Sequence, residues 1–440
     1  MAGDIAPSPF RRPEFRRLMA ISFTVAIGFG MVIPVLPLYA KSFGVGLAAI
    51  GLVQLVFGTT RFGFGLVGGL VVDRFGERAS TVAGLLIVAA SSFAAGLSTT
   101  FAQFVLARGF GGVGSALFIN GLMNRIIRTI EPEAMGRATG AFRSSFLVGI
   151  GAGPALGGVV AQHFGLAAPL LFYGAGLLVA TVIAWFVMAG DERGTAAERR
   201  SPLEAVRMAV PLFRDLRYVV ALLATGVGWW TVSGPAQVVG VVFARDQLHL
   251  TKPEIGVALT LLSVGELLVL LVAGRLADRY GRRAVVVPAL VVSAAATAGM
   301  GGTTHSPIAF YALLVLIGGS IAAGATAAGG LLADSIPKGG SGAAVGLNQM
   351  AGDLGYLLSP AAVGALAEAT SFATAYLVAA VPAVLVLGVA LRLPGARPRA
   401  RKGARPAPAA LAETQIVAGE SDIEGLEPHA PGAAVELPPT

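Results

Sequence analysis

Four ionisable residues, Arg61, Arg108, Glu266 and Asp353, lie inside stretches of otherwise apolar sequence. If such a stretch crosses a bilayer, an ionisable side chain within it is costly and marks a candidate functional site. A buried carboxylate can carry a proton near neutral pH, and a carboxylate beside an arginine can form an ion pair that opens and closes. These residue types therefore predict proton transfer and ion pairing within a membrane.

The composition indicates that the elements around these residues are membrane helices. Of the 440 residues, 55% are hydrophobic and only 13% are charged, whereas a soluble domain carries roughly 25% charged residues. The net charge of +8 comes from basic residues in short loops beside apolar runs. Membrane topology explains that pattern, so no nucleic-acid partner is expected. The absence of cysteine excludes disulfides, thiolate metal sites and cysteine nucleophiles.

Twelve apolar runs are long enough to cross a bilayer, which takes about 20 residues of helix. They are expected near residues 18–38, 48–72, 79–98, 101–124, 138–161, 167–189, 218–243, 255–276, 284–302, 307–333, 341–366 and 372–393. A charged segment divides the runs six and six. We therefore expect a cytoplasmic N-terminal segment (1–17), a six-helix bundle (18–189), a cytoplasmic linker (190–217), a second six-helix bundle (218–393) and a disordered cytoplasmic tail (394–440).

The distribution of Lys and Arg predicts how the chain lies in the membrane. If both termini are cytoplasmic, 27 of the 32 basic residues lie on the cytoplasmic side. Only Lys41, Arg245 and Lys252 then lie outside, while Arg61 and Arg108 lie within spans. We expect a multi-pass protein of the cytoplasmic (inner or plasma) membrane with both termini in the cytoplasm.

The two groups of six runs carry an internal repeat. Residues 50–78 align without a gap over residues 255–283, at an offset of 205 positions. The alignment places Arg61 over Glu266, each 12 residues before an aspartate. That spacing is about 18 Å along a helix, which puts both residues near mid-membrane. Repeated halves with a site between them are the architecture of secondary transporters.

Both copies end in a charged turn that resembles the loop motif of the major facilitator superfamily, G-x-x-x-D-R-x-G-R-R. The copy GRLADRYGRR at 274–283 matches fully, whereas GLVVDRFGER at 69–78 has Glu77 where Arg or Lys is usual. We therefore expect the charge network of the first copy to be tuned differently. The residues that carry the motif are Gly69, Asp73, Arg74, Gly76, Gly274, Asp278, Arg279, Gly281 and Arg282.

Other segments extend this resemblance over about residues 18–393. LARGFGGVGSA at 106–116 resembles the fourth-helix motif R-x-x-x-G-x-G, built around Arg108, and GFGMVIPVLPLYA at 28–40 is similar to twelve-span members. GIGAGPALGG at 149–158 resembles the fifth-helix motif of the drug:proton antiporters, carried by Gly149, Gly153, Pro154, Gly157 and Gly158. The resemblance implies an all-α membrane protein of twelve transmembrane helices in two pseudo-symmetric six-helix halves, the major facilitator fold.

The resemblance also implies roles for the motifs. Asp73 and Asp278 would meet the positive N-termini of the eleventh and fifth helices, respectively, when an inner gate closes. If the turns were only positive-inside anchors, the arginines would be explained but the aspartates would not. In the fifth helix, the glycines and Pro154 permit close packing and a bend, so a role in coupling and plain helix packing both stay open.

The family arrangement packs the second helix against the eleventh, so Arg61 and Asp353 are expected to approach each other across the interface between halves. The pair is either a lock of one access state or a static pair. Glu266 has no evident basic partner at its depth and is the leading candidate for a proton carrier, with Asp353 second. Glu266 could instead bind a cationic substrate or remain protonated as a packing residue. Arg108 would assist proton transfer or brace its helix.

A substrate cavity is expected among aromatic and amide side chains on these helices. Aromatic walls with few charges would suit hydrophobic or amphipathic compounds. The alternative for each side chain is a position against lipid or in the helix packing. The candidates are Phe29, Gln54, Asn120, Trp229, Trp230, Gln237, Asn348 and Tyr356.

These features predict a secondary active transporter that exports a small hydrophobic or amphipathic compound in exchange for protons, by alternating access. The alternatives are a sugar or metabolite transporter of the same superfamily and a non-transporting membrane sensor. The sequence has no phosphate-cradling G-x-x-x-x-G-K-[ST], no metal spacing of histidines and no nucleophile elbow, so we expect neither an enzyme nor a cofactor. The expected partners are the substrate, protons and the lipid bilayer, and we expect a monomer.

Overall fold

A computed structural model describes residues 12–130, 132–188, 210–336 and 341–394, and every regular element in them is a helix. The N-terminal half contains α1 (Pro13–Val32), α2 (Val35–Lys41), α3 (Leu47–Phe75), α4 (Glu77–Gly96), α5 (Phe101–Thr129), α6 (Pro132–Phe164) and α7 (Ala168–Val187). The C-terminal half begins with a short 3-10 helix, η2 (Val210–Arg214). It continues with α9 (Leu216–Thr231), η3 (Val232–Val239), α10 (Gly240–Asp246), α11 (Lys252–Tyr280), α12 (Arg283–Gly299), η4 (Met300–Gly302), α13 (Pro307–Ser335), α14 (Ser341–Ala369), α15 (Phe372–Ala379) and α16 (Val381–Ala390).

Within the described residues, twelve helical stretches are long and apolar enough to cross a membrane, and each overlaps one of the twelve predicted runs. The expectations for the N-terminal segment, the linker and the tail fall largely on residues 1–11, 189–209 and 395–440, which lie outside the described residues. The region boundaries therefore stay predictions.

Three of the predicted runs are interrupted along their length, and proline lies at each interruption. The first predicted run is split between α1 and α2 at Ile33 and Pro34, the seventh passes through the π-helix η3 at Pro235, and the twelfth breaks at Ala380 before Pro382. Proline lacks the backbone N–H that continues the helical ladder, which accounts for the positions of these interruptions.

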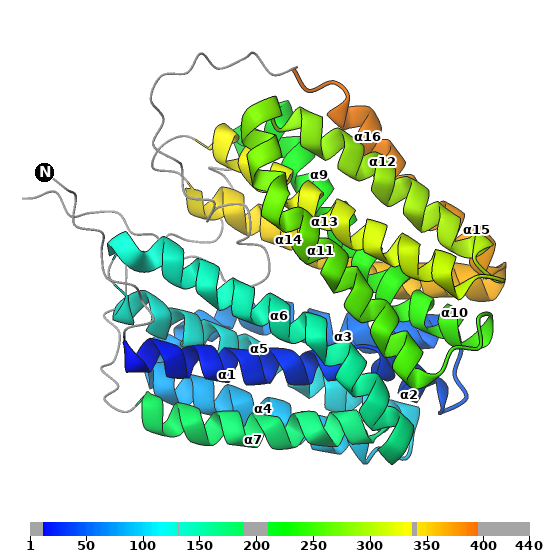
Figure 1. Cartoon of the computed structure of the whole chain (residues 1–440). Helices are drawn as coiled ribbons and strands as arrows, with labels where there is room; N and C mark the ends of the chain where they lie inside the picture. Colours follow the sequence, from blue (N-terminus) through cyan, green and yellow to red (C-terminus); the bar gives the residue numbers. More distant parts are fainter. Residues whose placement is uncertain (1–11, 131, 189–209, 337–340, 395–440) are drawn as a thin grey trace, which may run out of the picture.

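The two halves converge at one membrane face and separate toward the other (Figure 1). We call the face that carries Glu77, Arg125 and Arg282 the basic face, and the face that carries Lys41 and Asp246 the opposite face. The halves meet along two pairs of helices, α3 with α14 and α6 with α11. This is the predicted packing of the second helix against the eleventh.

Glycines along these helices show where the halves are in contact. A Cβ atom added at Gly51 would lie within 3.0 Å of Ala361, and one added at Gly256 would lie within 3.0 Å of Pro154, so the backbones touch near the opposite face. Nearer the basic face, a Cβ atom added at Gly63 on α3 or at Gly274 on α11 would have no other part of the described chain within 4 Å. The interface is therefore closed toward the opposite face and open toward the basic face.

Candidate transport site between the halves

A belt of polar side chains lies where α3 meets α14. Gln54 and Arg61 are seven residues apart on α3 and so share one helix face. On α14, Asp353 and Tyr356 share the facing side, and Gln54 Nε2 donates a hydrogen bond to the Tyr356 hydroxyl across the two halves. Gln349 Nε2 lies 3.4 Å from Asp353 Oδ1. The belt therefore joins the halves through side chains that the sequence analysis singled out.

Arg61 and Asp353 lie within electrostatic range of each other, as predicted from the family arrangement. Both side chains are partly buried, and they come from different halves. An opposite-charge pair between two bodies stabilises the arrangement in which they approach, and neutralising one partner removes that attraction. The structure thus places two side chains of opposite formal charge on facing helices of the two halves.

Arg108 on α5 is 1% exposed, and its guanidinium stacks over the Phe57 ring at 4.7 Å from the ring centroid. Its Nε and Nη1 atoms are buried without a hydrogen-bond partner in the described part of the chain. Tyr173 and Tyr356 lie within electrostatic range of it. A guanidinium that is buried with unsatisfied donors is rare in proteins and calls for an explanation.

A cavity of about 10 Å³, with room for about one water molecule in this access state, lies against Arg108 and between the two halves. The N-terminal half supplies an apolar wall together with Gln54 and Arg108, and the C-terminal half supplies Gln237 and Val238 from η3. The complete lining is Phe29, Val32, Ile33, Leu36, Pro37, Gln54, Arg108, Gln237 and Val238. Three predicted cavity residues, Phe29, Gln54 and Gln237, are therefore at the cavity, and Arg108 joins them.

Two predicted cavity residues are held in the packing of the C-terminal half instead. Asn348 is buried, and its Oδ1 accepts a hydrogen bond from Thr225 at 3.1 Å. The Trp230 indole donates to the Ala379 carbonyl at 3.1 Å. Both side chains pair with polar groups on neighbouring helices of the C-terminal half. An unpaired donor or acceptor buried there would cost free energy.

Two other candidates lie near the polar belt or on α5. Trp229 packs edge-on against Tyr356, with ring centroids 5.7 Å apart, and so supports the belt from within its own half. Asn120 Nδ2 lies 3.4 Å from the Gly65 carbonyl on α3. Neither residue is among the side chains that line the cavity.

Glu266 is not isolated, whereas the prediction that it lacks a basic partner at its depth stays a prediction. Glu266 lies partly buried on α11 and takes part in a polar or electrostatic interaction. Its helix packs on α13, where Gly318 approaches the Glu266 backbone so closely that an added Cβ would come within 3.0 Å. Glu266 therefore stays a candidate proton carrier because of its depth in the membrane and its repeat relation to Arg61, and not because its carboxylate is isolated.

Three polar contacts between the halves close the opposite face. Lys41 pairs with Asp246, the residue 205 positions later, so the pair joins equivalent positions of the repeat. Glu368 on α14 accepts a hydrogen bond from the Ala48 N–H, in the first turn of α3, at 3.1 Å. Lys252, at the start of α11, donates to the Ala161 carbonyl at 3.0 Å. All three must break before this face can open.

The fifth-helix motif presents its small residues to two different neighbours. Gly149, Gly153 and Gly157 face α1 of the same half, and an added Cβ at each would come within 3.0 Å of that helix. Gly158 and Pro154 instead touch the start of α11 in the other half, at Lys252 and Gly256. One row of the motif therefore packs the N-terminal half, and the other permits closure between halves.

The two rows predict different effects for the same substitution. Gly153→Ala should lower the melting temperature, because overpacking against α1 costs about 1–3 kcal/mol. Gly158→Ala should instead disfavour the closed opposite face by a similar free energy, about 5- to 100-fold in its equilibrium. We would measure labelling by an impermeant maleimide of Val242→Cys, at a residue that is 1% exposed and packs on the N-terminal half. The cysteine at position 242 should be labelled faster in the Gly158→Ala variant and at the unchanged rate in the Gly153→Ala variant. Equal labelling rates in the two variants would contradict the assignment of the two rows.

The charged turns at the basic face require glycine for their backbone conformation. Gly76 has φ 87° and ψ 162°, and Gly281 has φ 90° and ψ 157°, a region that is essentially restricted to glycine. Asp278 is 74% exposed and lies 2.9 Å from Arg282. That exposure agrees with an open basic face. Gly69 and Asp73 lie in α3, but their side chains are outside the described residues, so the partner of Asp73 stays a prediction.

Arg74 and Arg279, each two positions before its turn glycine, lie at the rim. Arg74 stacks on Phe75 and Arg279 on Tyr280, at 5.8 Å and 5.2 Å from the ring centroids. All four side chains are exposed. This placement fits the predicted role of these arginines at the membrane surface.

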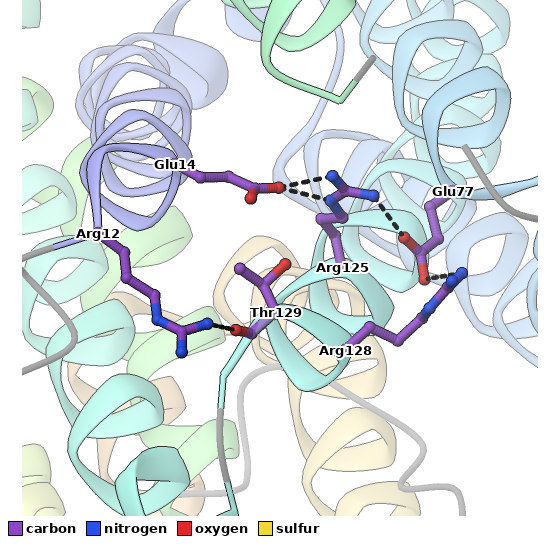
Figure 2. Close-up of polar contacts among 6 residues, drawn as sticks. All are labelled: Arg12, Glu14, Glu77, Arg125, Arg128 and Thr129. Atoms are coloured by element: carbon purple, nitrogen blue, oxygen red, sulfur yellow. Dashed lines mark hydrogen bonds and ion pairs between the residues drawn. The ribbon is translucent and has the colours of Figure 1, made fainter. Parts of the chain in front are cut away.

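Glu77, the departure from the family pattern, is the centre of a buried charge network (Figure 2). Its carboxylate is 5% exposed and pairs with Arg128 at 3.3 Å and Arg125 at 3.7 Å, both near the end of α5. Arg125 also pairs with Glu14 at the start of α1, at 2.7 Å. The network ties α1, α4 and α5 together, and the sequence analysis did not predict it.

The C-terminal half builds the same junction with the charges exchanged. Arg282 is equivalent to Glu77 in the repeat, and it approaches Asp334 near the end of α13 at 3.8 Å. Asp334 corresponds to Arg128, because α13 follows α5 at an offset of 206 residues, and Gly330 leaves the room that the Arg282 side chain occupies. The 205-residue offset was the signal that would have found this relation, since it aligns residues of opposite charge.

Comparison with known proteins gives a consistent result. The chain matches the sequence profile described as Major Facilitator Superfamily over residues 18–243 and 234–423. It is 23% identical over 366 residues to an uncharacterized MFS-type transporter of Methanocaldococcus jannaschii, covering 83% of this chain and 94% of the relative. It is 25% identical over 288 residues to Multidrug resistance protein 2 of Bacillus subtilis, covering 63% and 70%. Among solved structures, a bacterial homolog of the human lysosomal transporter Spinster has a TM-score of 0.74 at 14% identity, covering 88% of this chain and 97% of that one.

Proposed function

We propose that this chain, which belongs to the Major Facilitator Superfamily and is therefore a membrane transporter rather than an enzyme, exports a small hydrophobic or amphipathic compound in exchange for protons. The observation that carries the proposal is the placement of Arg61 and Asp353 on facing helices of the two halves, within electrostatic range of each other. The fifth-helix motif and the relatives named as multidrug resistance proteins support export of a drug-like compound.

The predicted orientation assigns each face of the structure to one side of the membrane. With the basic face in the cytoplasm of the cell, the structure is open to the inside and closed to the outside. In this state the Asp353 carboxylate lies near Arg61. Proton binding to Asp353 removes its negative charge and its attraction for Arg61, so protonation changes the free-energy difference between the two access states.

The proposal is tested with inside-out vesicles that hold an imposed proton gradient and a pH-sensitive dye. Lipophilic cations, neutral antibiotics, aromatic acids and sugars are added in turn. At least one compound should release protons from vesicles with the unmodified chain. Asp353→Asn should lower that proton release at least tenfold, while Asp353→Glu retains part of it, because only the glutamate keeps a titratable group. Glu266→Gln tests the second candidate in the same assay.

The outcomes separate the parts of the proposal. Compound movement without proton movement would leave a transporter but remove the antiport mechanism. Unchanged proton release in both Asp353→Asn and Glu266→Gln would exclude these carboxylates as carriers. If only sugars move, the metabolite transporter takes the place of the drug exporter.

A further inference from the structure

We propose that Arg108 binds an anionic group of the transported compound, so that the substrates are aromatic or otherwise amphipathic acids, including zwitterions. The inference rests on the proposed function only in taking the cavity between the halves as the substrate site. It names the chemistry that the cavity recognises, which neither the fold nor the family supplies.

The first argument is the state of the Arg108 side chain. It is 1% exposed, and its Nε and Nη1 atoms have no hydrogen-bond partner in the described part of the chain. An arginine cannot escape this cost by losing its proton, because the guanidinium stays charged in proteins. Phe57 covers one face of the guanidinium, at 4.7 Å, and leaves its donors for an acceptor in the guanidinium plane.

The second argument is charge. The neighbours within electrostatic range of Arg108 are Tyr173 and Tyr356, whereas the Asp353 carboxylate is within range of Arg61. No ion pair to Arg108 is found among the described residues, although Arg108 is among the most deeply buried large side chains. A carboxylate from a ligand would supply both the missing charge and the missing acceptors.

The third argument is the rest of the cavity. Phe29, Ile33 and Leu36 give it an apolar wall, and Gln54 and Gln237 give it two amides that can hydrogen-bond a ligand. An apolar wall with a few convergent polar groups selects an amphipathic compound. The lining comes from both halves, so a bound compound contacts the interface that must rearrange in alternating access. A bare lipophilic cation would meet the positive Arg108 without compensation, which argues against that class.

The test measures equilibrium binding to the purified full-length chain, without any proton gradient. The probes share one ring system and differ in charge: a naphthalene carboxylate, its methyl ester and the corresponding naphthylmethylammonium. The acid should bind at least tenfold more tightly than the ester or the amine. Arg108→Gln should weaken binding of the acid at least tenfold and change binding of the ester by less than about twofold, since a buried charge-assisted hydrogen bond is lost. Arg217→Gln, which removes an exposed arginine far from the cavity lining, is the matched control and should change neither.

Each outcome bears on the inference. Equal binding of acid and ester to the unmodified chain would overturn it, and this comparison needs no variant if Arg108→Gln does not fold. Tighter binding of the amine would overturn it as well. If chloride displaces the acid at low concentration and binds through Arg108 by itself, the site holds an inorganic anion and the substrate assignment fails. Because no gradient is used, a failure of proton coupling leaves the binding result unchanged, so the two proposals can fail separately.

Discussion

A disulfide between cysteines at positions 151 and 263 will abolish transport under oxidising conditions, and a reductant will restore it. Gly151 lies on α6 and Ser263 on α11, in different halves, and a Cβ atom at 151 would lie 3.0 Å from the Ser263 Cβ. Disulfides need a Cβ separation of about 3.5–4.5 Å, so a small shift suffices. The cross-link holds the halves together on the closed side, and transport should fall at least tenfold because the opposite face cannot open. The chain has no native cysteine, so the pair is the only possible disulfide within it.

The matched control joins two helices of one half. A Cβ at Gly149 would lie 2.7 Å from the Ala26 Cβ on α1, so an A26C and G149C pair is equally placed for a cross-link. If each half moves as a body, this cross-link should leave transport within about twofold of the reduced protein, an allowance for local strain. Uptake into inside-out vesicles before and after reduction measures both pairs. Inhibition by both, or by neither, would contradict motion of the halves about their interface.

The sequence predicted the helices and their grouping because a bilayer imposes strong constraints on both. A span needs a long apolar run, and all twelve runs were visible as such. The repeat placed Gly51 over Gly256, and the structure gives the reason: each is the point where its half touches the other half's backbone. The approach of Arg61 and Asp353 was also predictable, since it needed only helix depth and the pairing of two helices.

The contacts of individual side chains were less predictable, because they depend on rotation about each helix axis. Asn348 and Asp353 are on the same helix, yet Asn348 turns toward Thr225 within its half, and Asp353 faces Arg61. A polar side chain in a membrane helix serves packing as well as it serves a cavity, and composition does not separate the two uses. The interruption of the first span was visible in Pro34 and Pro37 but cannot be placed to the residue from sequence.

Repeat-related positions of opposite charge form a pattern that joins these observations. Lys41 and Asp246 are equivalent and contact each other, so the same charge at both positions would repel near the pseudo-two-fold axis. Glu77 and Arg282 are equivalent but lie in separate junctions, and there the neighbours have changed with them. Lys41 and Asp246 must carry opposite charges because they contact each other. Glu77 and Arg282 do not meet; each carries the charge opposite to that of its own neighbour, so both junctions are attractive.

Removing the Glu77 charge is the second change for which we expect a large effect, here on stability. Glu77→Gln should lower the free energy of unfolding by about 3 kcal/mol, the lower end for loss of one partner of a buried ion pair. The lower end applies because Arg125 keeps Glu14 and because Arg128 is 38% exposed. The corresponding fall in melting temperature is about 3 °C for a chain of 440 residues. Glu77→Arg, which restores the usual residue of the family motif, should be more destabilising still, because three like charges then meet.

The C-terminal half shows how that loss can be recovered. Arg282 occupies the equivalent position beside Gly330 and Asp334, and because α13 follows α5 at an offset of 206 residues, these correspond to Asn124 and Arg128 in the first half. The triple variant E77R, N124G and R128D rebuilds that arrangement and should regain at least half of the stability that E77R loses. Recovery will be incomplete, since glycine in a helix costs about 1 kcal/mol and Arg125 then faces the new arginine at position 77. Thermal unfolding in detergent measures all the variants, with R217Q as an exposed-arginine control.

The comparison distinguishes an electrostatic role from a steric one. If Glu77 matters through its charge, the order of melting temperatures is the unmodified chain, then the triple variant, then E77Q and last E77R. A triple variant no more stable than E77R would show that the two junctions are not interchangeable, and the repeat would then explain their positions but not their energetics. Stability of E77R equal to that of the unmodified chain would mean that Arg125 and Arg128 turn to solvent at little cost, and the network would then have no part in holding α1, α4 and α5 together.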